Sequence, residues 1–290
     1  MRALPDSIEH FLTACIRLDG SDVHLSPGLP PHVRVHGELT PMVGEPGCDA
    51  ARVSALCTDL LGEPVPAMPK GSLDGAVTSR DGARFRYNIF LRQNEPALAL
   101  RRLEDRFRGL SELGLPESLL KLAEARDGLV VVSGPTGAGK STTLATLLDH
   151  VNRTRSGHII TIEDPIEYLH KPVRCVVNQR QVGTDSPTFN DALVASLRQD
   201  PDVVLVGEIR DLDTIRTAIT AAETGHLVFT TLHAGDCVGS IERLVSVFHA
   251  DEQDGIRRQL SLVLRGVVAQ RLLPALSDDG PVRRVACSEI

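Results

Sequence analysis

The loop GPTGAGKST (134–142) constrains the fold of this chain most, because it directly follows the apolar run GLVVVS. Its residues satisfy the spacing G-x-x-x-x-G-K-[ST], in which glycines let the backbone turn its N–H groups inward around phosphate oxygens. A helix that begins near Lys140 adds its positive N-terminal end. The alternative is an ordinary Gly-rich turn between a strand and a helix. The strand before the loop and the helix after it favour nucleotide binding.

Two side chains in this loop have defined tasks. We expect Lys140 to contact the β- and γ-phosphates of ATP and the Ser141 hydroxyl to ligate Mg²⁺. The predicted cofactors are therefore ATP and Mg²⁺. The loop residues predicted to hold them are Gly134, Pro135, Thr136, Gly137, Ala138, Gly139, Lys140, Ser141 and Thr142.

From this loop onward, short β-branched runs alternate with helix-like stretches. Such fully apolar runs suit strands that are covered on both faces. The sequence therefore predicts an α/β domain with a mainly parallel sheet. The runs are GLVVVSG (128–134), HIITIED (158–164), DVVLVGE (202–208) and GHLVFTTLH (225–233).

The N-terminal part of the chain has a different pattern. An amphipathic start precedes strand-like pieces such as HVRVHGEL (32–39) and ARFRYNIFLR (83–92), which together predict a small α+β unit. The segment LEDRFRGLSELGLP (103–116) is polar and rich in turn residues, which predicts a connection between domains. We predict an N-terminal domain over 1–105, a linker over 106–116 and the phosphate-loop domain over 117–290.

Composition argues against several classes of function. The net charge of −7 would repel a phosphate backbone, so no nucleic-acid partner is expected. The 6 cysteines include no C-x-x-C pair, which gives no zinc spacing and fits a reducing cytosol. No run of ~18 uncharged apolar residues occurs, so no transmembrane segment is expected.

The run VVLVGEIRD (203–211) places a glutamate, Glu208, where a core strand is expected to end. In sheets that follow a phosphate loop, the carboxyl ends of the strands line the nucleotide crevice. A carboxylate there can orient or deprotonate the attacking water. The alternative is an acidic residue that balances the dipole of the following helix.

A second acidic stretch, TIEDPIEY (161–168), ends another apolar strand with Glu163 and Asp164, and Pro165 prevents the strand from continuing. Carboxylates at two strand ends can face one metal and phosphate centre. Proximity of like charges can then raise the pKa of one of them and make it a candidate base. The alternative is a solvated acidic turn.

Histidines and arginines supply further candidates. His226 begins a predicted strand and His233 ends it, so the two side chains lie too far apart to share one metal. A buried histidine with satisfied hydrogen bonds is the alternative for each. Arg86 and Arg101 lie in the N-terminal domain, and an arginine from such a domain can stabilise the transferring phosphate. Ordinary surface charge is the alternative for both arginines.

Four ordered motifs resemble those of the type II/type IV secretion E-type ATPase superfamily, and especially its PilT-like branch of type IV pilus retraction (twitching motility) ATPases. GPTGAGKSTT is similar to the Walker A motif, TIEDPIEY to the Asp box, LRQDPDVVLVGEIRD to the Walker B region and TGHLVFTTLH to the His box. SDVHL (21–25) and RFRYN (84–88) resemble segments of the N-terminal PAS-like domain of that branch. AQRLLP (269–274) resembles a helix near the end of its core. The resemblance covers nearly the whole chain.

This resemblance implies a PAS-like α+β domain followed by a RecA-like P-loop ATPase domain, in a hexameric motor that couples ATP hydrolysis to pilus retraction. It implies that Glu208 is the catalytic base and that Lys140 and Glu163 also serve catalysis. Asp164 would join Ser141 at Mg²⁺, partly through water.

The resemblance also assigns roles to the histidines and arginines. His226 and His233 would couple the nucleotide state to conformation. Arg86 and Arg101 would contact the phosphates.

Partners and location follow from the same resemblance. The implied partners are further copies in a homo-hexamer, an inner-membrane pilus platform protein and, as a further candidate, a paralogous ATPase. The implied location is cytoplasmic, peripheral at the inner membrane.

One departure from the family pattern leaves other functions open. The chain stops at ACSEI, whereas PilT-like proteins continue through C-terminal helices, so we expect a shortened form or a fragment without those helices. One alternative function is a pilus-extension or type II secretion assembly ATPase. The other is a non-hydrolysing, ATP-binding accessory subunit of a mixed ring.

Overall fold

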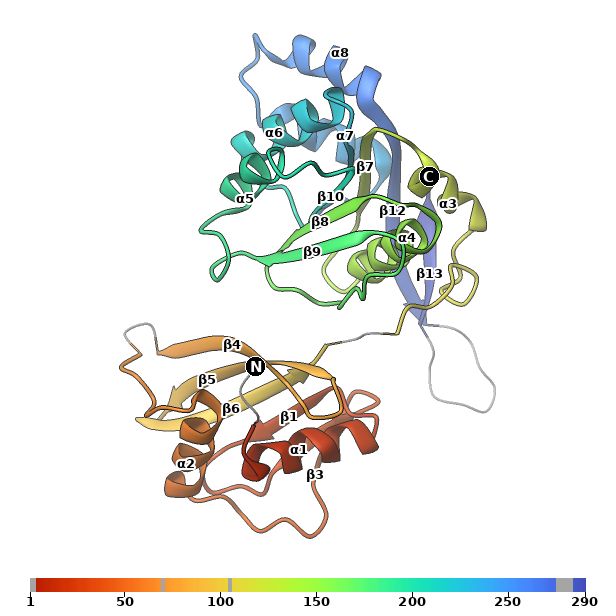
Figure 1. Cartoon of the computed structure of the whole chain (residues 1–290). Helices are drawn as coiled ribbons and strands as arrows, with labels where there is room; N and C mark the ends of the chain where they lie inside the picture. The colour runs from red at the N-terminus through yellow and green to blue at the C-terminus, as the bar shows by residue number, and fades with distance from the viewer. Residues whose placement is uncertain (1–3, 69–70, 104–105, 275–283) are drawn as a thin grey trace. The chain divides into compact units, whose positions relative to one another are not determined.

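The structure is a computed structural model that describes residues 4–68, 71–103, 106–274 and 284–290. The chain divides into two compact units, Met1–Asp105 and Arg106–Ile290 (Figure 1). The predicted domain boundary at residue 105 lies outside the described residues.

The first unit combines two helices with an antiparallel sheet in the order β3-β2-β1-β6-β5-β4. Side chains of both helices pack on one face of this sheet, where Phe11, Val23 and Phe85 are buried. Residues that alternate with these core residues, such as Arg86 and Asn88 of β5, project from the opposite face. The elements are α1 (Asp6–Arg17), β1 (Asp22–Leu25), β2 (His32–Val35), β3 (Glu38–Pro41), α2 (Ala50–Leu61), β4 (Ser72–Thr78), β5 (Arg84–Arg92) and β6 (Glu95–Arg102).

The second unit has a sheet in the order β13-β12-β7-β11-β10-β8-β9. All neighbouring strands in it are parallel except β12 and β13. The strands are β7 (Gly128–Ser133), β8 (His158–Glu163), β9 (Val176–Gln181), β10 (Val203–Val206), β11 (Leu227–Leu232), β12 (Leu264–Pro274) and β13 (Arg284–Glu289). The helices are η1 (Glu117–Leu119), α3 (Leu120–Glu124), α4 (Lys140–Thr154), α5 (Phe189–Ser196), α6 (Leu212–Glu223), α7 (Cys237–Ser246) and α8 (Gln253–Val263).

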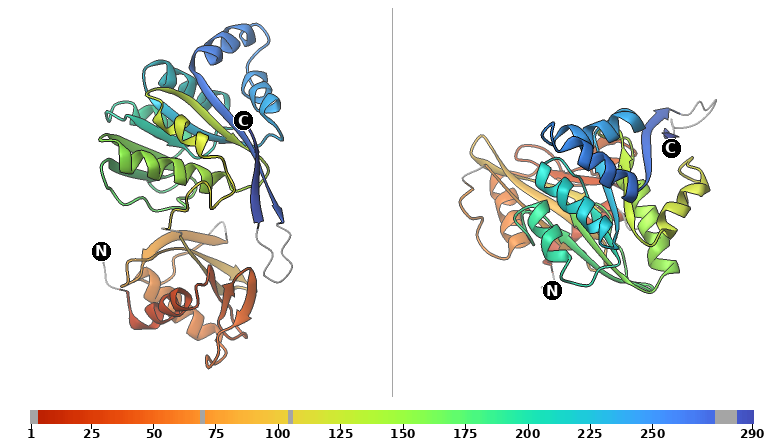
Figure 2. Two further views of the ribbon diagram at one scale, coloured as in Figure 1. Left: turned by 90° about the vertical axis from the view of Figure 1, so that its right-hand side faces the viewer. Right: turned by 90° about the horizontal axis from the view of Figure 1, so that it is seen from above.

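This sheet is covered on both faces, which explains why its central strands are continuous apolar runs. One core packs α5, α6 and α8 against Leu129, Ile160 and Val204. The other packs α3 and α4 against the alternating residues of the same strands, including Val130 and Ile159. The two layers of helices can be followed in Figure 2. The predicted α/β class with a mainly parallel sheet is confirmed.

Several helices begin where side chains cap them. Asp211 accepts a hydrogen bond from Thr214 N at the start of α6, and Asp236 accepts one from Gly239 N at the start of α7. Each cap satisfies an N–H group that the first helical turn leaves without a backbone partner. Among the described residues, none of the helices has the length and apolar character needed to cross a membrane.

Two sequence expectations need correction. Residues 106–116, expected as a linker, belong to the second unit, where Leu110 and Leu115 are buried in the core beside α4. Burial of these apolar side chains places the segment in the second unit, although its composition is rich in turn residues. AQRLLP, expected as a helix, forms the end of β12, because its backbone pairs with both β7 and β13.

Candidate active site

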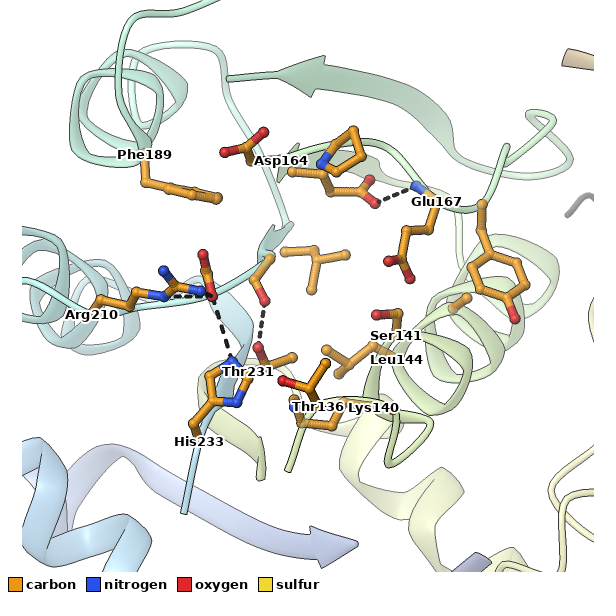
Figure 3. Close-up of a pocket in the computed structure, with 18 of the residues that line it drawn as sticks. Thr136, Lys140, Ser141, Leu144, Asp164, Glu167, Phe189, Arg210, Thr231 and His233 are labelled. Atoms are coloured by element: carbon orange, nitrogen blue, oxygen red, sulfur yellow. Dashed lines mark hydrogen bonds and ion pairs between the residues drawn. The ribbon is translucent and has the colours of Figure 1, made fainter. Parts of the chain in front are cut away.

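A pocket of about 360 Å³ lies at the carboxyl ends of the parallel strands of the second unit (Figure 3). The four apolar runs predicted from sequence are adjacent in the sheet as β7, β11, β10 and β8, so the segments that follow them meet at this edge. The pocket is lined by the phosphate loop, the two acidic segments and the end of β11. The polar residues that line it include Thr136, Lys140, Ser141, Glu163, Asp164, Glu167, Glu208, Arg210, Thr231 and His233.

The phosphate loop has a backbone that requires glycine at its first position. Gly134 has φ of +147°, and a Cβ atom there would lie 2.2 Å from the Gln270 carbonyl oxygen. Gln270, on β12, also braces the loop with its side chain. Its Nε2 donates to Ala138 O at 2.7 Å, and its Oε1 accepts from Thr143 Oγ1 at 2.7 Å. The loop is therefore held in shape by a strand more than a hundred residues away in sequence.

Lys140 is buried and lies folded onto the loop. Its Nζ donates to Gly134 O at 2.9 Å and to Pro135 O at 3.1 Å. Burial lowers the pKa of this ammonium group, while the negative charges of Glu208 and Glu167 raise it. A phosphate in the pocket would offer Nζ stronger acceptors than these two neutral carbonyls.

Glu163 ends β8 with a largely buried carboxylate. Oε1 accepts from Thr161 Oγ1 at 2.6 Å and from Gln179 Nε2 at 3.2 Å. Burial raises the pKa of Glu163, and these hydrogen bonds oppose the rise. The side chain is thus held at the carboxyl end of β8 by groups on two neighbouring strands.

Glu208 follows β10, and three nitrogen atoms approach its Oε2 atom, of which the two from Arg210 lie within hydrogen-bonding distance. The nearest are Arg210 NH2 at 2.6 Å and Arg210 Nε at 2.7 Å, and His233 Nε2 lies 3.8 Å away. Burial lowers the pKa of His233, as do the charges of Lys140 and two arginines, whereas Glu208 raises it. The pocket therefore brings the ends of β10 and β11 together around one carboxylate.

The oxygen atoms that line the pocket suit Mg²⁺ only if a bound nucleotide supplies further ligands. Hydroxyl and carboxylate oxygens are the ligands that this ion prefers, and it usually retains waters and binds substrate phosphates. Among the described residues, no group of three or more acidic, histidine or cysteine side chains forms a ready metal site. Ser141 and the carboxylates fit an ion that phosphate oxygens also hold. In Figure 3 the Glu167 side chain points toward Ser141, whereas Asp164 points toward Phe189.

Residues 6–287 match the family described as Type II/IV secretion system protein. The chain belongs to this family. It is 42% identical to the "Type IV pilus retractation ATPase PilT" of Pseudomonas aeruginosa over 98% of this chain and 81% of that protein. It is 39% identical to the "Type IV pilus ATPase PilU" of the same organism, over 95% of this chain and 72% of that protein.

A solved structure leads to the same branch of the family. The crystal structure of the pilus retraction motor PilT with bound ADP has a TM-score of 0.87 and 41% identity, and it covers 97% of this chain and 81% of that one. The structure of Legionella pneumophila ATPase DotB has a TM-score of 0.79 at 27% identity, over 100% of this chain and 81% of that chain. The predicted PilT-like relationship is confirmed, and family membership indicates a nucleotide-binding ATPase.

For this member of the family, one predicted histidine lies away from the pocket. His226 precedes β11, at the amino end of the sheet, where Nδ1 contacts Ala221 O at 2.9 Å. The length of β11 separates it from His233. Of these two histidines, His233 lines the pocket and His226 does not, and their coupling of the nucleotide state to conformation stays a prediction.

The two predicted arginines lie in the first unit. Arg86 and Arg101 face each other on β5 and β6, and Arg101 Nε contacts Asp22 Oδ1 at 2.7 Å. Like charges in directly opposed positions of a sheet cost stability. Asp22 offsets part of that cost.

Sequence reasoning missed several residues around the pocket. Gln179 lies outside the motifs quoted above, and Gln270 lies in AQRLLP, whose expected helical form gave no sign of its contact with the phosphate loop. Phe107, in the expected linker, stacks on the His170 ring with centroids 4.7 Å apart, and Tyr168 Oη lies 2.8 Å from Thr142 Oγ1. Arg210 and Tyr168 had a visible signal, because Arg210 follows Glu208 by two residues in the Walker B segment and Tyr168 ends the segment TIEDPIEY.

Proposed function

We propose that this protein is a Mg²⁺-dependent motor ATPase that couples ATP hydrolysis to type IV pilus retraction. The observation that carries the proposal is the convergence of Lys140, Ser141, Glu163 and Glu208 in one pocket, in a chain 42% identical to a pilus retraction ATPase over 98% of its length. The nucleotide is ATP, and its phosphates lie in the loop over 134–142.

The loop binds the phosphates with backbone N–H groups and with Lys140. On binding, Nζ exchanges the carbonyl oxygens of Gly134 and Pro135 for oxygens of the β- and γ-phosphates. Ser141 would hold Mg²⁺ with its hydroxyl, and Asp164 and Glu167 would hold it through water. When bound, this ion neutralises charge on the phosphate oxygens.

Hydrolysis is an in-line attack of water on the γ-phosphorus. The water oxygen bonds to phosphorus, the bond to the bridging oxygen of ADP breaks, and a proton leaves the water. Glu208 accepts that proton as the general base. Glu163 orients the attacking water. Both contacts of Arg210 use Oε2, so the Oε1 atom of Glu208 remains available to accept this proton.

Other residues respond to the phosphate. His233 Nε2 lies 3.8 Å from Glu208 Oε2. A change in the charge or position of Glu208 during hydrolysis would therefore act on His233 at the end of β11. Arg86 and Arg101 contribute positive charge to the phosphates from the first unit, as the family resemblance implies. His226 lies at the other end of β11, so a change at His233 would reach it only through that strand.

The working form is a homo-hexamer in the cytoplasm, peripheral at the inner membrane. Its partner there is the pilus platform protein, and a paralogous ATPase is a further candidate. The similarity to both PilT and PilU, two ATPases of one organism, supports a paralogous ATPase as that candidate.

The decisive experiment measures phosphate release and oligomeric mass on one sample. We expect Mg²⁺-dependent hydrolysis by a six-subunit species. Deletion of the gene in its native host is then expected to leave excess pili that do not retract. A hexamer that binds ATP without releasing phosphate would instead support the accessory-subunit function.

A second candidate function is pilus extension or type II secretion. It is supported by 40% identity to a Type II secretion system protein E of Xanthomonas campestris over 61% of this chain, although this region covers only 30% of that protein. The two functions predict opposite phenotypes. Loss of pili, or loss of secretion, on deletion would favour the second candidate.

A further inference from the structure

Gln179 lies behind the pocket wall, where its amide contacts the pocket residue Glu163, although no catalytic motif contains it. It lies on the edge strand β9 and pairs in parallel register with Thr161 of β8 (Figure 1). Residues in register on neighbouring strands project from the same face of the sheet. Thr161, Glu163 and Gln179 therefore share the face that packs toward α4.

The amide of Gln179 makes three hydrogen bonds. Nε2 donates to the Glu163 carboxylate at 3.2 Å and to Tyr168 O at 2.8 Å, and Oε1 accepts from His170 N at 2.8 Å. This pattern fixes the orientation of the amide, because a carboxylate and a carbonyl need donors and an N–H needs an acceptor. One side chain thus ties the buried carboxylate to the segment 168–170.

The connection reaches the phosphate loop as well. Tyr168 Oη lies 2.8 Å from Thr142 Oγ1, one residue after Ser141 on α4. Without Gln179, Glu163 would retain the Thr161 hydroxyl at 2.6 Å and a long contact from Glu167 N at 3.4 Å, which Figure 3 marks with a dashed line. Both remaining donors come from the chain segment of Glu163 itself, so the carboxylate would lose its hydrogen bond to another strand, the only such bond that it makes among the described residues.

We propose that Gln179 is a positioning residue for ATP hydrolysis, which acts by holding the Glu163 carboxylate in its reactive orientation. This role rests on the proposed function above. It predicts an effect on the chemical step and little effect on nucleotide binding, because Gln179 does not line the pocket itself.

The test replaces Gln179 by methionine, which keeps the length and volume of the side chain and removes its hydrogen bonds. We expect Gln179→Met to lower kcat ~10–100-fold, since a misplacement of ~1 Å at a reacting centre can cost ~10²-fold. KM for MgATP and the Kd for a fluorescent ADP are expected to change less than ~3-fold. The matched control is Gln181→Met, two residues along the same strand, whose side chain contacts Thr184 Oγ1 at 3.4 Å.

A double-mutant cycle separates positioning from a merely structural role. In a Glu163→Gln background, Gln179→Met is expected to lower the remaining rate by less than ~3-fold, because the two residues act as a unit. Additive losses would overturn the proposal. So would an unchanged kcat in Gln179→Met, or a loss of kcat accompanied by a large fall in melting temperature and in nucleotide affinity.

Gln179→Asn provides a second variant that keeps the amide but shortens its reach, and the same loss of kcat is expected for it. Full activity in a folded Gln179→Asn would contradict the role. Wild-type protein that releases no phosphate would overturn the proposed function itself. Normal turnover in the wild type and in Gln179→Met alike would overturn the role of Gln179 alone.

Discussion

Glu208 and Arg210 are joined through a single carboxylate oxygen, with Arg210 NH2 at 2.6 Å and Nε at 2.7 Å from Oε2. The other oxygen is left for a different partner. The Arg210 side chain is 66% exposed and that of Glu208 is 22% exposed, so the arginine shields the carboxylate from solvent on one side. Arg210 therefore orients the Glu208 carboxylate through Oε2 and leaves Oε1 without a contact from Arg210.

Glu208→Gln is expected to lower steady-state phosphate release by ~10²–10⁴-fold, because the amide cannot accept the proton from water. Affinity for a fluorescent ATP analogue is expected to stay within ~3-fold, since the loop and Lys140 are unchanged. Phosphate release is measured with the oligomeric mass of the same sample. The control is Glu242→Gln, at an exposed position on α7. Normal hydrolysis by Glu208→Gln would remove Glu208 from the role of base.

Lys140→Ala is expected to abolish measurable nucleotide binding, because it removes the one buried ammonium group at the loop. Titration with fluorescent ADP and MgATP measures this loss. Lys121→Ala, at an exposed position of α3, is the matched control and is expected to bind as the wild type does. Unchanged affinity in Lys140→Ala would show that the loop does not hold the phosphates.

Gly134→Ala is expected to reduce the free energy of unfolding by about 2–4 kcal/mol. Its φ of +147° is strained for any other residue, and the new Cβ would lie 2.2 Å from Gln270 O. Gly137→Ala is the matched comparison, since φ there is +77° but nothing lies within 4 Å of the new atom. Its cost is expected to be about 1 kcal/mol. Urea unfolding of both variants tests the difference, and equal costs would contradict the close approach of β12.

His170 is expected to make the stability of the protein fall in mild acid. The ring is buried, its Nδ1 has no hydrogen-bond partner among the described residues, and burial lowers its pKa from 6.5 to about 4. The neutral ring is favoured in the folded state, so its contribution is complete above pH ~6.5 and is lost as pH falls toward ~4. The shift corresponds to a loss on the order of 3 kcal/mol.

Urea unfolding at a series of pH values between neutrality and the folded pKa of His170 tests this. His170→Phe retains a ring against Phe107 and removes the titrating group, so it is expected to flatten the dependence of unfolding free energy on pH. His249→Phe, at an exposed position, is the control and is expected to keep the wild-type slope. An unchanged slope in His170→Phe would assign the acid sensitivity to other groups.

Local spacing in the sequence was enough to predict the phosphate loop and the central strands. The loop places glycines, a lysine and a serine within nine consecutive residues, 134–142. Such a pattern can be recognised from the sequence because it does not depend on contacts with distant parts of the chain. The apolar runs at 128–134, 158–164, 202–208 and 225–233 were long enough to mark buried strands. Because carboxyl ends of parallel strands meet at one edge, Glu163 and Glu208 could also be expected to lie near the loop.

Tertiary structure alone decided which groups face these residues. Gln270 reaches the phosphate loop because β12 pairs with β7, and Gln179 reaches Glu163 because β9 pairs with β8 in one particular register. His226 lies away from the pocket because a whole strand separates it from His233. Strand order and register depend on contacts between residues far apart in the chain, and a slip of one position would turn each of these side chains to the other face of the sheet.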